Sequence, residues 1–352
     1  DLGQKTHEDE HLILKTLGFR VNPAGKLVRD LGGVQKFRDH WDKNRGKLDY
    51  EIDGIVVTIN DNRVFQKLGV VGKSPRGAIA YKFSPKESTT KVKDIIVSVG
   101  RTGTMTPIAI LEPVEIGGVT VSRATLHNED EIKRLGLKVG DTVIVGRAGD
   151  VIPDVIKVLK ELRTGKEREF YMPKKCPVCG GPVKRAEGEA AYRCINKHCP
   201  AVKRETVYHF VSKNTLDIAG VGPKIIDQLM DAGLIKDASG LYKLKKEDLL
   251  NLPRFADKSA DNTIRAIQEN KKPSLDKFIF ALGIRHVGEE TAFDLAKRFG
   301  RLEKLAGASL EEIKRIPNIG DVVAKSVYVW FRNKYNNRLL EKFKKAGVRP
   351  TE

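Results

Sequence analysis

The sequence predicts a multidomain α+β protein that contains a small β barrel, a cysteine-rich ribbon and a region of helical repeats. Short β-type runs punctuated by Gly and Pro recur between residues 91 and 162, which is typical of a small barrel. All four cysteines lie between residues 176 and 199. From residue 213 onward, helical patterns are interrupted by Gly-centred breaks at a nearly constant spacing. By length alone, 352 residues allow two or three domains.

The charge of the chain indicates a polyanionic partner. Lys and Arg number 64 against 46 Asp and Glu, and the net charge is +18. These basic residues are spread along the chain, which is the electrostatic pattern of nucleic-acid-binding proteins. The alternatives are a generally basic proteome and a ribosome-associated protein. No apolar run approaches the ~20 residues of a membrane-spanning helix, and the polar opening DLGQKTHEDEH carries no cleavable signal, so we expect no membrane association.

The first part of the chain is expected to contain both helix and strand. Residues 1–47 are charged and rich in loop-forming residues, with one helix expected at 8–17. Strands are expected at 50–60 (YEIDGIVVTIN) and 77–83 (GAIAYKF). In both segments, β-branched or alternating residues are bounded by Gly, Pro and Asp.

Two carboxylates, Glu51 and Asp53, stand at the start of the first of these strands and are candidates for handling a metal ion or a phosphate. Strict alternation places both on one face and Thr58 on the other. A pocket shared by Asp53 and Thr58 would therefore require a twist or a bulge in the strand.

Residues 91–162 carry the runs of the expected barrel. Small five-stranded barrels often bind nucleic acid on one face. The candidate phosphate contacts from this segment, whose alternative interpretation is solvated strand residues, are Arg101, Arg123, His127 and Arg147.

The cysteines follow the pattern C-x2-C-x14-C-x4-C, with ligand candidates Cys176, Cys179, Cys194 and Cys199. Two such pairs on tight turns can bring four thiolates to one tetrahedral centre, which is the preferred geometry of structural zinc. Four protein ligands leave no open position for water, so we expect structural Zn2+; two disulfides are the alternative. We expect His198 at the surface. The ribbon is basic, so it is also expected to lie against a phosphate backbone.

The helical region repeats a Gly-centred unit. The repeats align at Gly222, Ala256, Gly288 and Gly320, with spacings of 34, 32 and 32 residues. Glycine at a helix start lets backbone N–H groups approach an anion, and the helix dipole favours that anion. Gly220, Gly222, Gly288 and Gly320 are therefore candidate DNA contacts, of the kind that binds phosphates without reading sequence. Structural Gly turns are the alternative.

The second repeat, NLPRFADKSADNTIRAI, has lost both glycines. It is expected either only to pack, or to contact DNA through Arg254 and Lys258.

In their order along the chain, these segments resemble the bacterial NAD-dependent DNA ligase family. The resemblance runs from about residue 8 to residue 349, and besides the four cysteines it is carried by YEIDGIVV, SPRGAIAYKF, VGRTGTMTPIAILEPV, VSRATLHN, GDTVIVGRAGDVIP, LDIAGVGPK, ALGIRHVGE and KKAGV. It implies part of an adenylation (nucleotidyltransferase) domain at 1–86, an OB-fold barrel at 87–166, a zinc ribbon at 167–212 and a helix-hairpin-helix domain at 213–352.

The resemblance also implies a reaction. In the family, a lysine attacks the α-phosphate of NAD and keeps AMP, the AMP passes to the 5′-phosphate at a nick, and the 3′-hydroxyl expels it. Such phosphoryl transfer depends on positioning and charge neutralisation. Asp53 matches a ligand of Mg2+ or Mn2+, and Lys82 matches a lysine that contacts the adenylate phosphate. Glu51 and Thr58 complete the candidate nucleotide site; Glu51 alternatively caps or pairs at the strand start.

The sequence departs from the family pattern where catalysis is concerned. The nucleophile motif Lys-x-Asp-Gly is absent, because the Asp-Gly pair at 53–54 follows Glu-Ile. The family's usual lysine at 58 is a threonine, which cannot neutralise a phosphate, and its usual aromatic residue at 77 is a glycine, so local packing should differ. We also expect that the segments that recognise the nicotinamide half of NAD and the C-terminal BRCT domain of the family are not part of this sequence.

We therefore expect the C-terminal portion of an NAD-dependent DNA ligase, with the first part of the adenylation domain lost or encoded elsewhere. The complete form would seal nicks in replication and repair, in a bacterial cytoplasm and associated with the nucleoid. The alternative is a non-catalytic fragment that binds nicked DNA. In both cases we expect a monomer whose partner is nicked double-stranded DNA, and no self-adenylation of these residues alone.

Overall fold

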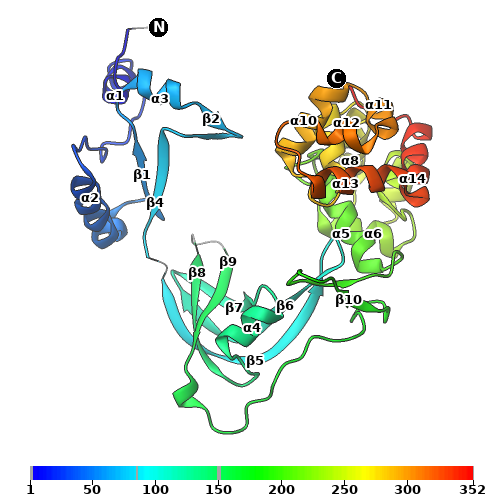
Figure 1. The fold of residues 1–352 in the computed structure, drawn as a ribbon, viewed down its shortest axis with the longest axis horizontal. Helices are drawn as coiled ribbons and strands as arrows, with labels where there is room; N and C mark the ends of the chain where they lie inside the picture. The colour runs from blue at the N-terminus through cyan, green and yellow to red at the C-terminus, as the bar shows by residue number, and fades with distance from the viewer. Residues whose placement is uncertain (1–2, 85, 149–151, 352) are drawn as a thin grey trace. The chain divides into compact units, whose positions relative to one another are not determined.

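The computed structural model describes residues 3–84, 86–148 and 152–351. Two compact units make up the chain. The first comprises Asp1–Ile95, Ala109–Thr125 and Leu135–Glu169, and the second comprises Ile96–Ile108, Leu126–Arg134 and Phe170–Glu352. The expected multidomain α+β class is confirmed, because β-rich and helix-rich segments follow one another along the chain (Figure 1).

The described N-terminal part of the first unit contains two short antiparallel pairs of strands, three α-helices and one 3-10 helix (Figure 1). Its elements are α1 (His7–Thr16), α2 (Leu31–Asn44), η1 (Arg45–Lys47), β1 (Gly54–Thr58), α3 (Asn62–Leu68), β2 (Val70–Val71), β3 (Ser74–Pro75) and β4 (Ala78–Lys82). The expected helix at 8–17 and both expected strands are confirmed.

Helix α2 was not expected, since residues 1–47 appeared loop-rich with a single helix. Asp30 begins α2 by accepting a hydrogen bond from the backbone N–H of Gly33 (2.7 Å). An aspartate in this position satisfies an otherwise unpaired N–H group of the first turn. The two glycines in that first turn, Gly32 and Gly33, weaken the helical signal in the sequence.

Strands β1 and β4 pair one to one, from Gly54 opposite Lys82 to Thr58 opposite Ala78. The strands approach closely at Gly54, where a Cβ atom would lie 2.6 Å from the carbonyl oxygen of Tyr81. This pairing contains no bulge between residues 54 and 58, so the bulge that a shared pocket of Asp53 and Thr58 would require is not present there.

The position where the family's aromatic residue is replaced, Gly77, lies against Phe65 of α3. A Cβ atom at Gly77 would lie 2.4 Å from Cδ2 of the Phe65 ring. Phe65 therefore occupies the space that a side chain at position 77 would need. This is how the local packing differs from that expected for an aromatic residue at position 77.

The barrel has five strands in the order β6–β5–β8–β9–β7, and β7 closes it by pairing with β6. Its elements are β5 (Glu87–Val99), β6 (Thr104–Ile116), β7 (Val119–Thr125), α4 (Glu129–Leu135), β8 (Thr142–Ala148), β9 (Ile152–Val158) and η2 (Lys160–Leu162). Along β6, alternate side chains are buried, as a strand with one face on a core requires. Beyond β9, Arg163 donates two hydrogen bonds to the buried Asp141 (2.7 and 2.8 Å), which fixes the turn before β8.

In the second unit, the cysteine ribbon is joined to the first residues of β6. Strands β10 (Val183–Arg185) and β11 (Tyr192–Cys194) form a hairpin, and β11 continues the sheet by pairing with β6. In that pairing Tyr192 lies opposite Met105, whose buried side chain belongs to the same apolar cluster as three of the cysteines.

The remainder of the second unit is helical (Figure 1). Its elements are α5 (Pro200–Val211), α6 (Pro223–Asp231), η3 (Ala238–Lys243), α7 (Lys246–Leu250), α8 (Asp257–Glu269), α9 (Leu275–Ala281), α10 (Glu289–Phe299), α11 (Leu302–Gly307), α12 (Leu310–Lys314), α13 (Asp321–Arg332) and α14 (Lys334–Lys345). One continuous apolar core joins these helices, and Phe210 of α5 stacks on Phe343 of α14 within it (5.1 Å between ring centroids). Within the described residues, every helix is too short or too polar to cross a membrane.

Candidate functional site

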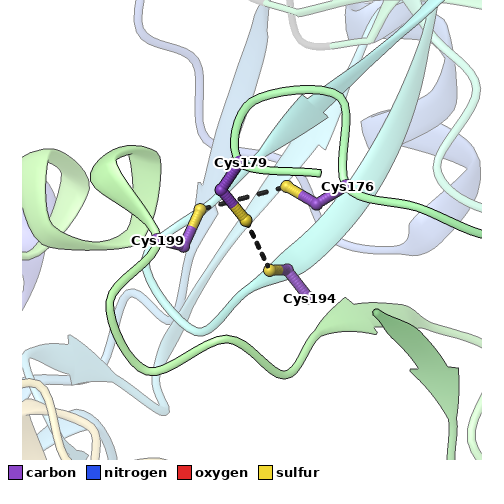
Figure 2. Close-up of side chains that lie close together, drawn as sticks. All are labelled: Cys176, Cys179, Cys194 and Cys199. Atoms are coloured by element: carbon purple, nitrogen blue, oxygen red, sulfur yellow. Dashed lines mark hydrogen bonds between the residues drawn. The ribbon is translucent and has the colours of Figure 1, made fainter. Parts of the chain in front are cut away.

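The four cysteines converge on one point, as their spacing predicts. Figure 2 shows their side chains directed toward one another, and the four Sγ atoms all lie within 4.8 Å of each other. Cys176 Sγ is 3.9 Å from Cys199 Sγ, and Cys179 Sγ is 3.6 Å from Cys194 Sγ. A tetrahedron of thiolates ~2.3 Å from a central zinc has edges of about 3.8 Å. The donor set and its spacing therefore fit structural Zn2+.

Local backbone geometry builds this cluster from three directions. Cys176 and Cys179 flank a tight turn closed by the hydrogen bond from Gly180 N–H to the Cys176 carbonyl (2.9 Å). Gly180 adopts the left-handed conformation (φ 66°) that the turn requires. Cys194 ends β11 and Cys199 precedes the first turn of α5.

The surroundings of the sulfur atoms favour thiolate at one position and oppose it at another. Hydrogen bonds donated by Asn196 and by the Gly181 N–H lower the pKa of Cys179 to about 6. Burial raises the pKa of Cys194 to about 12. A buried thiolate needs a compensating cation, and a bound divalent metal would supply it. His198 lies outside this cluster, with its ring edge-on to Tyr335 (6.4 Å between centroids).

The candidate nucleotide residues separate into two groups along β1. Lys82 Nζ donates a hydrogen bond to Asp53 Oδ2, and the Asp53 carbonyl accepts one from Phe83 N–H (2.9 Å). Both charged side chains remain about half exposed, so this pair is accessible to a ligand. Thr58 lies at the other end of β1, and Glu51 is exposed before the strand. The fold thus brings Asp53 and Lys82 together and leaves Thr58 apart.

Two arginines beside this pair were not identified from the sequence. Arg38 Nε of α2 donates to the Lys82 carbonyl (3.2 Å), and its guanidinium lies 5.1 Å from the ring centroid of Tyr81. Arg45 lies 5.2 Å from the ring centroid of Phe83. These contacts link α2 and η1 to the end of β4. No local motif surrounds either arginine, so only the packed structure reveals them.

The barrel candidates occupy different environments. Arg123 is exposed on β7, and His127 is exposed just after it in a left-handed conformation (φ 57°). Arg147 lies in β8, but its side chain is outside the described part of the structure. Arg101 is half-buried, and among the described residues its Nη1 atom has no hydrogen-bond partner. Burial lowers the pKa of Arg101, and the charge of Glu205 opposes that effect.

The four helical repeats share one turn geometry. Two residues before each aligned position, the backbone is left-handed, with φ between 64° and 77°, at Gly220, Arg254, His286 and Asn318. The next residue closes the turn with the same N–H to carbonyl bond in every copy, at 3.1 to 3.4 Å: Val221 to Ile218, Phe255 to Leu252, Val287 to Ile284, and Ile319 to Ile316. The aligned residues then begin α6, α8, α10 and α13. The second repeat therefore keeps the turn although it has lost both glycines.

The glycines at the aligned positions are not explained by the backbone or by packing. Gly222, Gly288 and Gly320 have extended conformations that any residue adopts. A Cβ atom at each would meet nothing within 4 Å. Among the described residues, no cap side chain accepts a hydrogen bond from the first N–H groups of the three helices that follow. The turns therefore leave open space in front of uncapped N–H groups, which is the arrangement that accepts a phosphate oxygen.

Comparison with known proteins identifies three of these segments as domains of one family and the helical region as helix-hairpin-helix. Models of NAD-dependent DNA ligase domains match at residues 1–86 (adenylation domain), 89–167 (OB-fold domain) and 175–201 (C4 zinc finger domain). A SAM-like helix-hairpin-helix tandem matches residues 213–269, and a helix-hairpin-helix motif matches 277–340.

Similar proteins carry the same description. A protein named DNA ligase from Halothermothrix orenii is 50% identical over 351 residues, which is 99% of this chain and 52% of that protein. Proteins named DNA ligase from Syntrophus aciditrophicus and Pelotomaculum thermopropionicum are each 49% identical over 350 residues, covering 98% of this chain and 52% of their own lengths. The chain therefore spans about half the length of the curated relatives that it matches.

Proposed function

The chain belongs to the NAD-dependent DNA ligase family, and on this premise we propose that it is the DNA-holding half of a ligase that seals nicks in duplex DNA. The single observation that supports this most directly is the set of repeated turns, three of which place a glycine without a packing role in front of uncapped helix N–H groups. Such turns bind phosphates without reading base sequence, as a nick-sealing enzyme requires. Replication and repair in a bacterial cytoplasm, near the nucleoid, are the corresponding setting.

We propose that Asp53 and Lys82 serve the nucleotide site of this ligase. Among the described residues, the cysteines form the one cluster of three or more metal-ligating side chains. Asp53 would therefore supply a single carboxylate to Mg2+ or Mn2+, and the remaining oxygen ligands would come from phosphates and water. Lys82 would neutralise an adenylate phosphate, and its present pairing with Asp53 keeps it aligned at the end of β4. Glu51 and Thr58 stay proposed members of the site.

The complete reaction uses NAD as the AMP donor, but these residues contain no Lys-x-Asp-Gly nucleophile. We therefore expect no covalent AMP on this polypeptide when it is incubated with NAD labelled in the adenylate phosphate. A stable, acid-resistant AMP adduct would show that another lysine acts as nucleophile here. This sequence observation also favours the second candidate function, a non-catalytic monomer that binds nicked DNA.

The DNA-binding proposal is tested by the salt dependence of binding to a nicked duplex. Several phosphate contacts should make log K fall steeply with log [salt], by a slope of about 0.9 for each phosphate neutralised. The variant Gly288→Asp adds a carboxylate in open space, so the fold should tolerate it while phosphate is repelled, and we expect roughly tenfold weaker binding.

The matched control for that variant is Ser309→Asp. Ser309 caps α12 outside the four turns and already accepts a hydrogen bond from Glu312 N–H (3.2 Å). The variant Ser309→Asp adds the same charge at a helix start and should leave binding to the nicked duplex unchanged. A flat salt response, or equal losses in both variants, would refute the proposed binding through the turns.

A further inference from the structure

The turn between β10 and β11 presents Glu189, which three arginines contact, two of them through its carboxylate. The backbone carbonyl of Glu189 accepts a hydrogen bond from Arg185 Nε (2.6 Å), and its Oε2 accepts one from Arg193 Nε (3.2 Å). Its Oε1 accepts one from Nη2 of Arg285, which lies 96 residues further along the chain. Arg285 belongs to the turn of the third helical repeat. The cysteine ribbon therefore contacts that turn through a specific charge pair within the second unit.

The ribbon holds Glu189 ready for this contact. Asp130 accepts two hydrogen bonds from Arg185 (2.9 and 2.5 Å), and Thr102 accepts one from Arg193 (2.9 Å). The hydrogen bonds from Arg285 and Arg193 hold the pKa of the Glu189 carboxyl below its usual value, so it is ionised at neutral pH. The backbone carbonyl and one carboxylate oxygen of Glu189 are already hydrogen-bonded within the ribbon, so its side chain loses little conformational freedom when it binds Arg285.

The third turn differs from the other three in the residues that stabilise its conformation. Its left-handed residue is His286, whose Cβ atom makes that conformation less favourable than it is for glycine, whereas the first turn has Gly220 there. One position earlier, the second and fourth turns have Pro253 and Pro317, whose rings restrict the backbone. The third turn has Arg285 at that position. It therefore has neither the glycine nor the proline that favours the same conformation in the other copies.

We propose that Glu189 is a positioning residue that fixes the third turn through Arg285, in place of the glycine or proline that stabilises the other three turns. The proposal rests on the proposed function in one respect: the turn matters because it is expected to bind a DNA phosphate. The geometry of that phosphate site then depends on the folded, metal-bound ribbon as well as on the helical core.

Hydrogen exchange of the turn-closing amides in the DNA-free chain tests this directly. Val287 N–H closes the third turn, and the equivalent amides of Val221 and Ile319 close the first and fourth. In Glu189→Gln, exchange at Val287 should be about fivefold faster, the effect of one partly exposed ion pair, and the other two amides should be unchanged. Unchanged exchange at Val287, or equal acceleration at all three amides, would overturn the proposal.

Rescue separates positioning from general damage. Adding His286→Gly or Arg285→Pro to Glu189→Gln supplies the local device found in the other turns, and the Val287 amide should return to its wild-type rate. Asp231→Asn, which breaks a similar arginine pair between α5 and α6 (Arg204 Nη2 to Asp231 Oδ1, 2.7 Å), is the matched control and should leave Val287 unaffected. Zinc content should be equal in all variants. Failure of both rescues would overturn the proposal.

Binding to a nicked duplex distinguishes positioning from charge masking. If Glu189 positions the turn, Glu189→Gln should weaken binding several-fold, and His286→Gly should restore it. If Glu189 only masks Arg285, Glu189→Gln should instead bind more tightly, with a steeper salt slope, and the proposal would be overturned. A wild-type chain that does not bind DNA would refute the proposed function, while the exchange experiment would still decide whether Glu189 positions the turn.

Discussion

Residues 3–84 and the helical repeats of residues 213–351 differ in how their apolar side chains are used. In the described part of the first region, the large apolar side chains that are buried are Val34 and Phe83, which are 9% and 6% exposed. Leu31, Val56 and Ile79 are 83%, 70% and 69% exposed. In the helical region, one buried cluster extends from α5 to Val348, which lies beyond the end of α14. The helical repeats therefore have a core of their own, and the first region has almost none.

The difference follows from the architecture of each region. A two-stranded sheet such as β1–β4 does not bury enough surface to be stable by itself in water. Stacked helix pairs bury each repeat against its neighbours, so a continuous core forms. The first region is organised mainly by local polar devices, such as the capping box of Thr6 and Asp9. We expect local opening to be easy there and difficult in the helical core.

Removal of the metal from the cysteine cluster should have the largest effect on stability. The ribbon is held by metal binding, whereas the helical region is held by its apolar core and the first region by local polar contacts. Structural zinc sites contribute on the order of 10 kcal/mol to folding. A chelator should therefore abolish hydrogen-exchange protection over residues 176–199, while the core of α9 stays protected. Measured loss of zinc with unchanged exchange in the ribbon would contradict this expectation.

A cavity in the helical core should have the next largest effect. Phe343 is 2% exposed and stacks on Phe210, so Phe343→Ala should lower the free energy of unfolding by about 3–5 kcal/mol. The matched change in the first region, Ile79→Ala, removes an exposed side chain and should stay within about 0.5 kcal/mol. Urea denaturation of both variants gives the comparison. A loss for Ile79→Ala as large as that for Phe343→Ala would show that residues 3–84 have a core after all.

The smallest of these effects concerns a charge pair that supports the helical core. Burial alone would raise the pKa of Asp237, but hydrogen bonds from Lys342 (2.7 Å) and Ser239 outweigh it, so the pKa lies below its usual 3.8. A carboxyl with a lowered pKa contributes stability above its unfolded pKa, and that stability is lost as pH falls through the folded value. Asp237→Asn should therefore cost about 1–2 kcal/mol at pH 7.

The pH dependence of that cost is the decisive measurement. The difference between wild type and Asp237→Asn should shrink as pH falls below about 4, because both chains then lack the charge. Asp9→Asn is the control in the first region, where the partly buried Asp9 has a pKa lowered by its hydrogen bond with Thr6. It should fray α1 without changing the unfolding of the second unit. A pH-independent difference for Asp237→Asn would rule out the charge pair as its cause.

Much of the fold was predictable because it is encoded by short-range patterns. Cysteine spacing predicted one metal cluster, and the structure forms it from a tight turn at Cys176 and Cys179, a strand end at Cys194 and a helix start at Cys199. The period of the glycines likewise predicted the repeated turns. Helix α2 was missed because its first turn contains two glycines, which local propensity disfavours and its packing against β1 outweighs.

The sequence by itself determined the family, the cysteine cluster, the strand that follows Asp53, the strand that carries Lys82, and the helical repeats. The tertiary structure decided which of these residues meet. It paired Lys82 with Asp53 and placed Glu189 against Arg285. It also buried Arg101 in part, and it joined the ribbon to the barrel sheet through the pairing of β11 with β6. Local patterns depend on neighbours a few residues apart, whereas these contacts join residues 29 to 96 positions apart and form only when separate elements pack together.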